Sequence, residues 1–341
     1  MMERPLNIPV ALFLFKRKDT LARIFAEIRK AQPAKVYLLG DGPRSEQEAE
    51  AVAAVRNYAV AQVDWDCQVV TRFPEHNVGV YQNIGAGAQW VLEREESAIF
   101  LEDDNLPAPT FFRFCRELLD KYRDDSRVLW ICGTNYLQEY RNSSADSYMF
   151  TRHLLPCGWA TWSAKFLSSY DGGLRLLCRE SEQVVRSTYT DLRLYRQEID
   201  VIRKTKRLLE VDEKRASWDR QMQFSVRANS QFGVSPAVNQ IRNIGVDEHS
   251  THGGNSLRKT MTARFCEIPT GALEFPLRHP HFVAPDPGYE KLLGETILYP
   301  LRQRILLRIM RFLKPLLGLR TDESLVLKLR KIRETSNAKR N

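Results

Sequence analysis

The 341-residue chain has no long hydrophobic run. No stretch approaches the roughly 18 consecutive apolar residues that a membrane-spanning helix needs, so the sequence predicts no transmembrane helix. The apolar run 9–15 is short and lacks a small-residue cleavage site, so it is not typical of a signal peptide. Internal repeats and low-complexity segments are also lacking.

Paired cysteines and a glycine-rich phosphate loop are lacking as well. The six cysteines are scattered, which excludes a zinc finger or a redox dithiol and predicts small core residues in a reducing cytoplasm: Cys67, Cys115, Cys132, Cys157, Cys178 and Cys266. Gly85 and Gly87 fall inside a predicted helix rather than at a strand-to-helix turn, so they are not a dinucleotide fingerprint.

What the first 135 residues do contain is a regular alternation of apolar runs and helical patterns. Strands are predicted at 9–15, 36–39, 68–73, 98–102 and 128–132, with helices beginning at Asp19-Thr20 and Ser45 and others at 80–94 and 110–122. This pattern predicts an α/β fold with a mostly parallel sheet flanked by helices. This regular alternation of strands and helices is predicted to stop over 136–170, and residues 175–215 are predicted to be helical and highly charged.

The net charge of +9 lies in the C-terminal tail. Residues 301–341 hold 12 Lys and Arg against 3 Asp and Glu, so residues 1–300 are neutral. A basic amphipathic helix is predicted over 297–314, ended by Pro315, with these residues on its apolar face: Leu298, Leu301, Ile305, Ile309, Phe312 and Leu313. It indicates binding to an anionic membrane surface or a partner protein, with packing on its own domain as the alternative. Nucleic acid is not an expected partner, because no aromatic residues are interleaved with the basic ones.

The most distinctive segment is 98–104, an apolar run that ends in Glu102, Asp103 and Asp104. In an open α/β sheet, ligands bind at the carboxyl ends of the strands. Adjacent carboxylates repel one another unless a cation neutralises them, and hard oxygen ligands suit Mg²⁺ or Mn²⁺. A solvated acidic turn is the alternative.

Polar residues follow the other predicted strands at the same edge. Lys16 and Arg17 follow the first strand, 41–44 follows the second, and 76–79 follows the third, with Asn83 one helical turn further on. Together they supply acceptors for a base and ribose and donors for phosphates, next to the acidic residues that could hold a metal.

With these motifs the chain resembles the GT-A glycosyltransferases, particularly bacterial nucleotide-sugar transferases related to family 2 and to the N-acetylglucosaminyltransferase I type. The resemblance covers about residues 8–255 and rests, beyond the motifs above, on segments 131–135, 158–162, 217–219, 239–245 and 251–252. Lys16-Arg17-Lys18 departs from the Asn-Arg-Pro that is commoner after the first strand. The implied organisation is a nucleotide-sugar-binding half at 1–135, an acceptor-binding and catalytic half at 136–290, and a basic helical tail at 291–341.

The resemblance implies a nucleotide-sugar donor bound across the first half. The implied donor-binding residues are Phe15, Arg17, Asp41, Arg44, Asn77, Gly79, Asn83, Glu102 and Asp103. Asp104 and the downstream His252 would hold a Mn²⁺ or Mg²⁺ ion that neutralises the departing diphosphate, although His252 could also be a turn residue.

On the acceptor side, the resemblance implies that Asp219 is the catalytic base of an inverting enzyme. The alternative is that Asp219 caps a helix. Trp159, Trp162 and Trp218 are candidates to contact the sugar or acceptor, although large aromatic residues are as often part of the core.

The function expected from the sequence is therefore inverting, metal-dependent transfer of a sugar, UDP-linked, to a glycan or lipid-linked acceptor in surface polysaccharide synthesis. The expected location is the cytoplasmic face of the cell membrane, with the tail as a peripheral anchor. The alternatives are a sugar-1-phosphate nucleotidyltransferase, which would be expected to have a glycine-rich basic loop after the first strand, and a non-catalytic scaffold with a transferase-like fold.

Overall fold

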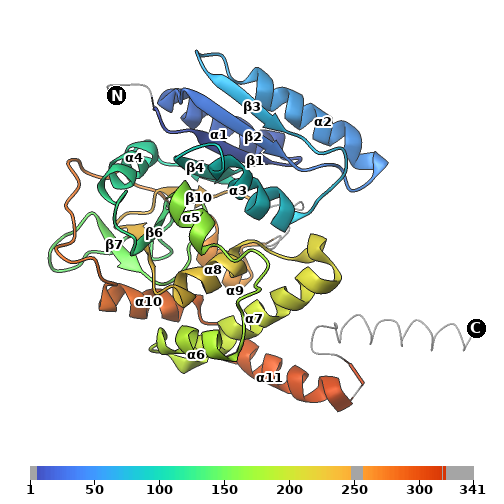
Figure 1. Ribbon diagram of the computed structural model, residues 1–341, viewed down its shortest axis with the longest axis vertical. Coiled ribbons are helices and arrows are strands. Elements are labelled where there is room, and N and C mark those ends of the chain that lie inside the picture. Colours follow the sequence, from blue (N-terminus) through green and yellow to red (C-terminus); the bar gives the residue numbers. More distant parts are fainter. Residues whose placement is uncertain (1–5, 247–255, 317, 320–341) are drawn as a thin grey trace, which may run out of the picture. The chain divides into compact units, whose positions relative to one another are not determined.

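The computed structural model describes residues 6–246, 256–316 and 318–319 (Figure 1). The chain forms two compact units, residues 1–297 and 298–341. The boundary predicted at residue 291 falls inside a helix, Pro287–Ile297, whose Tyr289 and Leu293 are fully buried in the first unit. That helix therefore belongs to the body of the protein and not to the tail.

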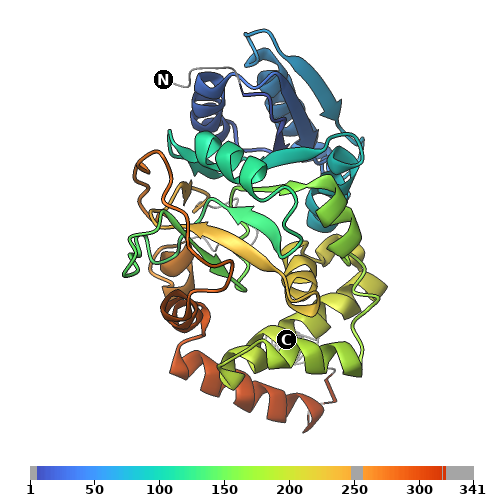
Figure 2. The same cartoon turned by 60° about the vertical axis from the view of Figure 1, so that its left-hand side comes forward.

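One eight-stranded sheet organises the first unit, in the order β3-β2-β1-β4-β8-β6-β9-β7. The strands are β1 (Val10–Leu14), β2 (Lys35–Gly40), β3 (Gln68–Arg72), β4 (Ser97–Glu102), β6 (Val128–Cys132), β7 (Tyr148–Thr151), β8 (Trp159–Trp162) and β9 (Phe232–Pro236). A separate antiparallel ribbon pairs β5 (Asn105–Pro107) with β10 (Ile241–Asn243). The predicted α/β class with a mostly parallel sheet is confirmed, and Figure 2 shows the blue strands and β9 toward opposite ends of this sheet.

Helices cover both faces of the sheet because successive strand residues point to opposite sides. In the first unit they are α1 (Lys18–Ala31), α2 (Glu46–Ala61), α3 (Ala86–Leu92), α4 (Phe111–Lys121), α5 (Ser163–Ser169), α6 (Arg179–Ser187), α7 (Leu192–Val211), α8 (Asp219–Ala228), α9 (Thr260–Phe265) and α10 (Pro287–Ile297). Leu12 and Leu14 pack with α1, α2 and α4, whereas Ala11 and Phe13 pack with α3, α5, α8 and α10. The core is therefore divided into two layers by the sheet.

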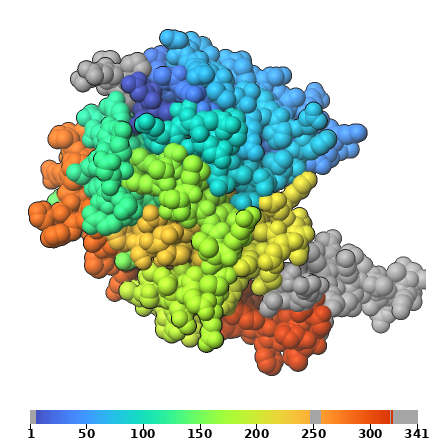
Figure 3. Space-filling view, in the orientation of Figure 1, coloured from blue at the N-terminus to red at the C-terminus, as the bar shows by residue number. Residues whose placement is uncertain are grey.

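The regular alternation of strands and helices stops over 136–170, as predicted, but the segment still forms strands. This segment contains β7 and β8, and β8 lies antiparallel between β4 and β6. Each strand is only four residues long, so its pairing depends on partners far away in the sequence. The predicted charged helices of 175–215 are confirmed as α6 and α7, which Figure 3 shows on the surface of the first unit.

Two predicted helix starts differ in detail. Helix α1 begins at Lys18 with Arg17 as its N-cap, so Asp19 lies in the first turn. Ser45 is the N-cap of α2, but the predicted reciprocal capping bonds are not made. Glu48 instead accepts hydrogen bonds from Lys16 and from the Arg44 backbone, which competes with its capping role.

The three tryptophans predicted to contact sugar are core residues. Trp159 is 1% exposed, and its ring lies between Phe100 and Trp130, with both centroids 4.0 Å away. Trp218 packs against the same stack. Trp162 is also buried, and its Nε1 donates to the Leu119 carbonyl. The prediction that these rings stack on a sugar is corrected, because their faces are covered by other side chains.

Lys165 links the segment that follows α4 to this core through hydrogen bonds. Its Nζ donates to the carbonyls of Tyr122, Asp125 and Val128 and lies 3.6 Å from the centroid of the Trp162 ring. Burial lowers the pKa of Lys165 from 10.5 to about 8.

This shift predicts a pH-dependent contribution to stability. Between about pH 8 and 10.5 the unfolded chain binds more protons at Lys165 than the folded chain, so the contribution to stability rises with pH. We expect the difference in unfolding free energy between wild type and Lys165→Met to grow across this window, as measured by urea denaturation at several pH values. A difference that stays constant or falls would contradict the assignment.

The second unit contains α11 (Leu301–Leu316), which begins later than predicted and includes Pro315. Pro315 lies in the last turn, where Gly318 donates to its carbonyl and Leu319 donates to Lys314. Several apolar side chains of this helix are exposed, among them Leu301, Ile305, Ile309 and Phe312. Along the described part of the chain, no helix combines the length and apolar character needed to cross a bilayer.

Candidate functional site

The acidic residues lie where β4 ends, as predicted. Glu102 closes β4, and Asp103 and Asp104 form the turn into β5. Strand β10 pairs with β5, and the Ile244 amide donates to the Asp104 carbonyl over 2.8 Å. The ribbon therefore fixes the backbone of Asp104 beside residues about 140 positions later in the chain.

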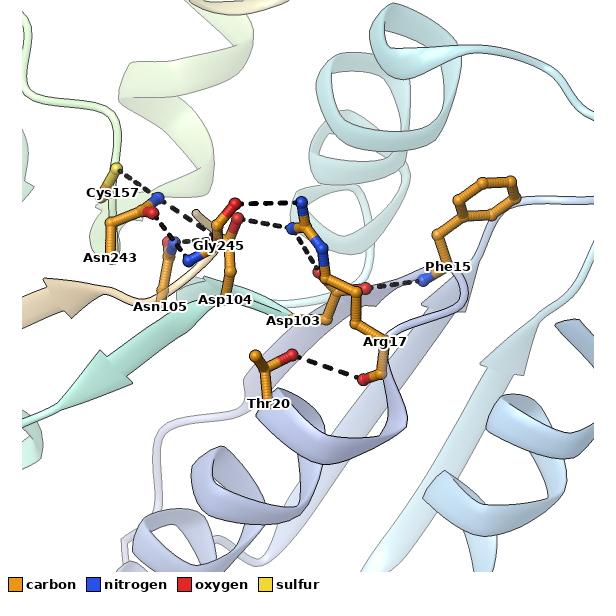
Figure 4. Close-up of polar contacts among 9 residues, drawn as sticks. All are labelled: Phe15, Arg17, Thr20, Asp103, Asp104, Asn105, Cys157, Asn243 and Gly245. Atoms are coloured by element: carbon orange, nitrogen blue, oxygen red, sulfur yellow. Dashed lines mark hydrogen bonds and ion pairs between the residues drawn. The ribbon is translucent and has the colours of Figure 1, made fainter. Parts of the chain in front are cut away.

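Arg17 reaches this turn from the end of β1. Its Nη1 lies 2.7 Å from Asp104 Oδ2 and 3.5 Å from Asp103 Oδ1, and its Nη2 lies 3.4 Å from the Gly245 carbonyl (Figure 4). The amide of Phe15 donates to Asp103 Oδ2 over 3.0 Å. The segment that follows β1 supplies both donors, because β1 lies parallel to β4 with Phe13 opposite Glu102.

Burial and mutual repulsion act on the acidic cluster. Burial raises the pKa of Glu102 well above its ordinary value, with further contributions from Asp104, Asp103 and Asp219. Burial and then Asp104 raise the pKa of Asp103 to about 7, against the lowering influence of Arg17. Burial and repulsion therefore outweigh the influence of Arg17 on the pKa values of Glu102 and Asp103.

Asp41 organises the loop that follows β3. Its Oδ1 accepts from the amides of Gly42 and Val78, and its Oδ2 accepts from Asn77 Nδ2 and the Gly79 amide, over 2.7 to 3.1 Å. The structure thus brings together Asp41, Asn77 and Gly79, three of the predicted donor-binding residues. Their hydrogen bonds join them to one another and to the backbone of neighbouring loop residues, including Gly42, Pro43 and Val78.

Gly79 allows this loop to approach the 3₁₀ turn η2 (Glu213–Arg215). Its φ is +86°, and an added Cβ would lie 2.6 Å from the Lys214 carbonyl oxygen. We expect Gly79→Ala to lower the unfolding free energy by about 2 kcal/mol, from backbone strain and the clash with backbone atoms. Chemical denaturation checks this. Gly233→Ala is the control because its Cβ would make only ordinary contacts of 3.6 Å or more, and equal losses in the two variants would contradict the prediction.

Three further predicted donor-binding residues are Phe15, Arg44 and Asn83. Arg44 pairs with Glu48, and its guanidinium carbon lies 5.2 Å from the centroid of the half-buried Phe15 ring. Asn83 is buried in a π-helical turn, η1 (Tyr81–Gly85), that precedes α3. The predicted helix of 80–94 therefore begins with a π turn.

Asp219 is the first residue of α8, and Trp218 is the N-cap. The alternative that Asp219 is the capping residue is therefore wrong. Its side chain is 22% exposed and lies 3.5 Å from Arg220 Nε. Asp219 also contributes to the raised pKa of Glu102, after burial, Asp104 and Asp103.

The predicted metal ligand His252 lies outside the described residues. Two residues that were not predicted as site residues form hydrogen bonds with the Asp104 side chain. Asn105 Nδ2 donates to Asp104 Oδ1 over 2.7 Å, and Asn243 Nδ2 lies 3.4 Å from the same oxygen. A Cβ on Gly245 would lie only 2.2 Å from Asp104 Oδ2. The Asn243-Ile244-Gly245 segment belongs to the family resemblance, but the resemblance does not predict its contacts with Asp104.

The donor set fits a divalent cation that substrate phosphates complete. Asp103 and Asp104 offer hard carboxylate oxygens at the end of β4, and Mg²⁺ is commonly held by one or two carboxylates with phosphates. Among the side chains that the structure describes, no group of three His, Cys, Asp or Glu residues converges to hold a metal without such help.

A cavity of about 310 Å³ lies elsewhere in the first unit. Its lining includes His153, Tyr189, Arg227 and Glu290, and it does not include the acidic cluster. The acidic cluster is the stronger candidate for a functional site, because carboxylates gathered at strand ends indicate function more directly than the volume of a cavity.

No protein-family model and no curated protein matches the chain. A solved structure of UDP-glucose pyrophosphorylase with UDP-glucose is 10% identical, with 70% of this chain and 94% of that chain covered and a TM-score of 0.34. 4-diphosphocytidyl-2C-methyl-D-erythritol synthase from Anaerococcus prevotii is 6% identical, covering 57% and 85%, with a TM-score of 0.32. HddC from Yersinia pseudotuberculosis with GMP-PN is 7% identical, covering 46% and 77%, with a TM-score of 0.29. Similarities this low carry no argument about the reaction, and the α/β class rests on the sheet itself.

Proposed function

We propose that the protein is an inverting, metal-dependent glycosyltransferase that uses a nucleotide diphosphate sugar. The observation that carries the proposal is the meeting of Asp103, Asp104 and Arg17 at the carboxyl ends of β1 and β4. Carboxylates and a guanidinium at this edge suit a ribose, a diphosphate and a divalent cation. Asp41, Asn77 and Gly79 form the neighbouring wall of this donor site.

In this proposal the chain positions charge around the departing diphosphate. Asp103 and Asp104 would hold Mn²⁺ or Mg²⁺, which supplies Lewis-acid stabilisation of the leaving group when bound. Arg17 would bind a phosphate through its two Nη groups. Asp219 would accept the proton of the acceptor hydroxyl as its oxygen attacks the anomeric carbon. Burial of Asp103 keeps bulk water from weakening these interactions.

Thermal shift with nucleoside diphosphates tests the donor site. UDP, GDP, ADP and CDP are each added with and without Mn²⁺, and a ligand at about 100 times its dissociation constant should add roughly 2.7 kcal/mol of stability. Stabilisation that needs Mn²⁺ supports the proposal. The absence of a shift with every nucleotide would favour the scaffold alternative.

The second candidate is a sugar-1-phosphate nucleotidyltransferase, a class that includes the pyrophosphorylase named above. The connection between β1 and α1 is short, because β1 ends at Leu14 and α1 begins at Lys18. It leaves no room for a glycine-rich phosphate loop, which disfavours this candidate. Exchange of labelled pyrophosphate into UTP in the presence of UDP-sugar separates the two reactions, since only a nucleotidyltransferase catalyses it.

We further propose that the tail places the enzyme on an anionic membrane, where a lipid-linked acceptor for surface polysaccharide would lie. The exposed apolar residues of α11 and the basic residues of the same helix support this role. Deletion of residues 298–341 should abolish co-sedimentation with vesicles containing phosphatidylglycerol and leave nucleotide binding unchanged. Undiminished sedimentation would contradict the role of the tail as an anchor.

A further inference from the structure

Arg17 contacts carboxylate oxygens that a metal ion at the acidic turn would use. Its guanidinium contacts the Oδ2 of Asp104 and the Oδ1 of Asp103. The three side chains are only 11% to 15% exposed, so water and salt weaken these ion pairs less than those at the surface. Arg17 therefore competes strongly with any other cation for these two carboxylates.

The opposite carboxylate oxygens are held by donors of the protein itself. Asp103 Oδ2 accepts from the Phe15 amide, and Asp104 Oδ1 accepts from Asn105. These donors fix the carboxylates so that their remaining oxygens face Arg17. A divalent cation that used those oxygens would meet the guanidinium directly, and two cations at that distance repel each other.

We propose that Arg17 acts as a built-in cation that excludes divalent metal from Asp103 and Asp104 until a nucleoside diphosphate draws its guanidinium away. The second half of this inference rests on the proposed function. A diphosphate offers Arg17 bidentate oxygens in place of the two carboxylates, and its negative charge beside Asp103 and Asp104 favours a divalent cation there. Nucleotide and metal then bind with positive coupling, and either one alone binds weakly.

The first test measures Mn²⁺ binding to the nucleotide-free, full-length protein, from the electron paramagnetic resonance signal of free Mn²⁺. We expect Arg17→Met to bind Mn²⁺ about tenfold more tightly than wild type, within the usual range of coupling between sites. Lys16→Met is the matched control. It removes an equal charge one residue away, from a side chain that pairs with Glu48 at 2.8 Å, and should change the affinity by less than about twofold. Equal affinities in Arg17→Met and wild type would overturn the inference.

Arg17→Lys covers the case in which Arg17→Met does not fold. Lysine keeps the charge but lacks the planar fork that bridges two carboxylates, so Mn²⁺ affinity should rise to an intermediate level. An affinity equal to that of wild type in a folded Arg17→Lys would count against the inference.

The second test adds UDP. In wild type, UDP should tighten Mn²⁺ binding about tenfold, and in Arg17→Met this gain should shrink. The same gain in both proteins would overturn the inference and leave the proposed function intact. Tighter Mn²⁺ binding in nucleotide-free Arg17→Met, with no effect of any nucleoside diphosphate on wild type, would support the exclusion of metal by Arg17 and count against the proposed function.

Discussion

Asp104→Asn should abolish most sugar transfer while leaving the protein folded. The substitution removes the negative charge that would hold the cation on the departing diphosphate, and several kcal/mol of transition-state stabilisation depend on that charge. A loss of about 4 kcal/mol corresponds to about 10³-fold in turnover. Release of UDP from a UDP-sugar, with and without acceptor, measures the effect.

Folding should survive because the backbone contacts of Asp104 do not depend on its charge. The Ile244 amide still donates to the residue 104 carbonyl, and asparagine has nearly the same volume. Loss of the carboxylate also relieves repulsion on Glu102 and Asp103. Asp64→Asn is the control, since Asp64 pairs with Arg29 and is 60% exposed. Turnover by Asp104→Asn within tenfold of this control would refute the assignment.

Trp159→Ala should cause a large loss of stability. The ring lies between Phe100 and Trp130 and is 1% exposed, so truncation leaves a cavity at the centre of one core layer. Losses of about 4 kcal/mol are typical when a buried aromatic residue is truncated to alanine. Urea denaturation measures the effect, with Trp159→Phe as a variant that keeps one ring in the stack and loses less.

The same pair of variants tests whether Trp159 contacts a sugar. A core residue should leave the affinity of folded Trp159→Phe for donor and acceptor unchanged. If Trp159→Ala kept the stability of wild type but lost sugar binding, the buried stack would be the wrong description of this residue.

The first half of the fold could be predicted because each element there carries its own pattern. The strands β1, β2 and β4 are continuous apolar runs, and α1 has a regular apolar face. Strands β7 and β8 could not be predicted, because four residues rich in aromatic side chains fit a strand or a loop equally well. Their state is decided by long-range partners, such as the pairing of Ala160 with Ile99 and Ile131.

The candidate site, like the fold, could be predicted only in part from the sequence. Acidic residues at the end of an apolar strand could be identified from local sequence, and the structure places them as expected. The ion pair between Arg17 and Asp104 could not, because it requires β1 and β4 to be neighbours, and strand order is a property of the whole sheet. The hydrogen bond from Asn243 to Asp104 could not be predicted either, because it depends on the pairing of β5 with β10.

The position of β8 has a consequence for dividing the protein into fragments. Strand β4 pairs with β1 on one side and with β8 on the other, and β6 also pairs with β8. A fragment that ends at residue 135 would therefore expose open backbone donors and acceptors along both β4 and β6. Such edges recruit other chains. Residues 1–135 should precipitate when they are expressed alone, and residues 136–162 are the minimum addition that would place β8 between β4 and β6.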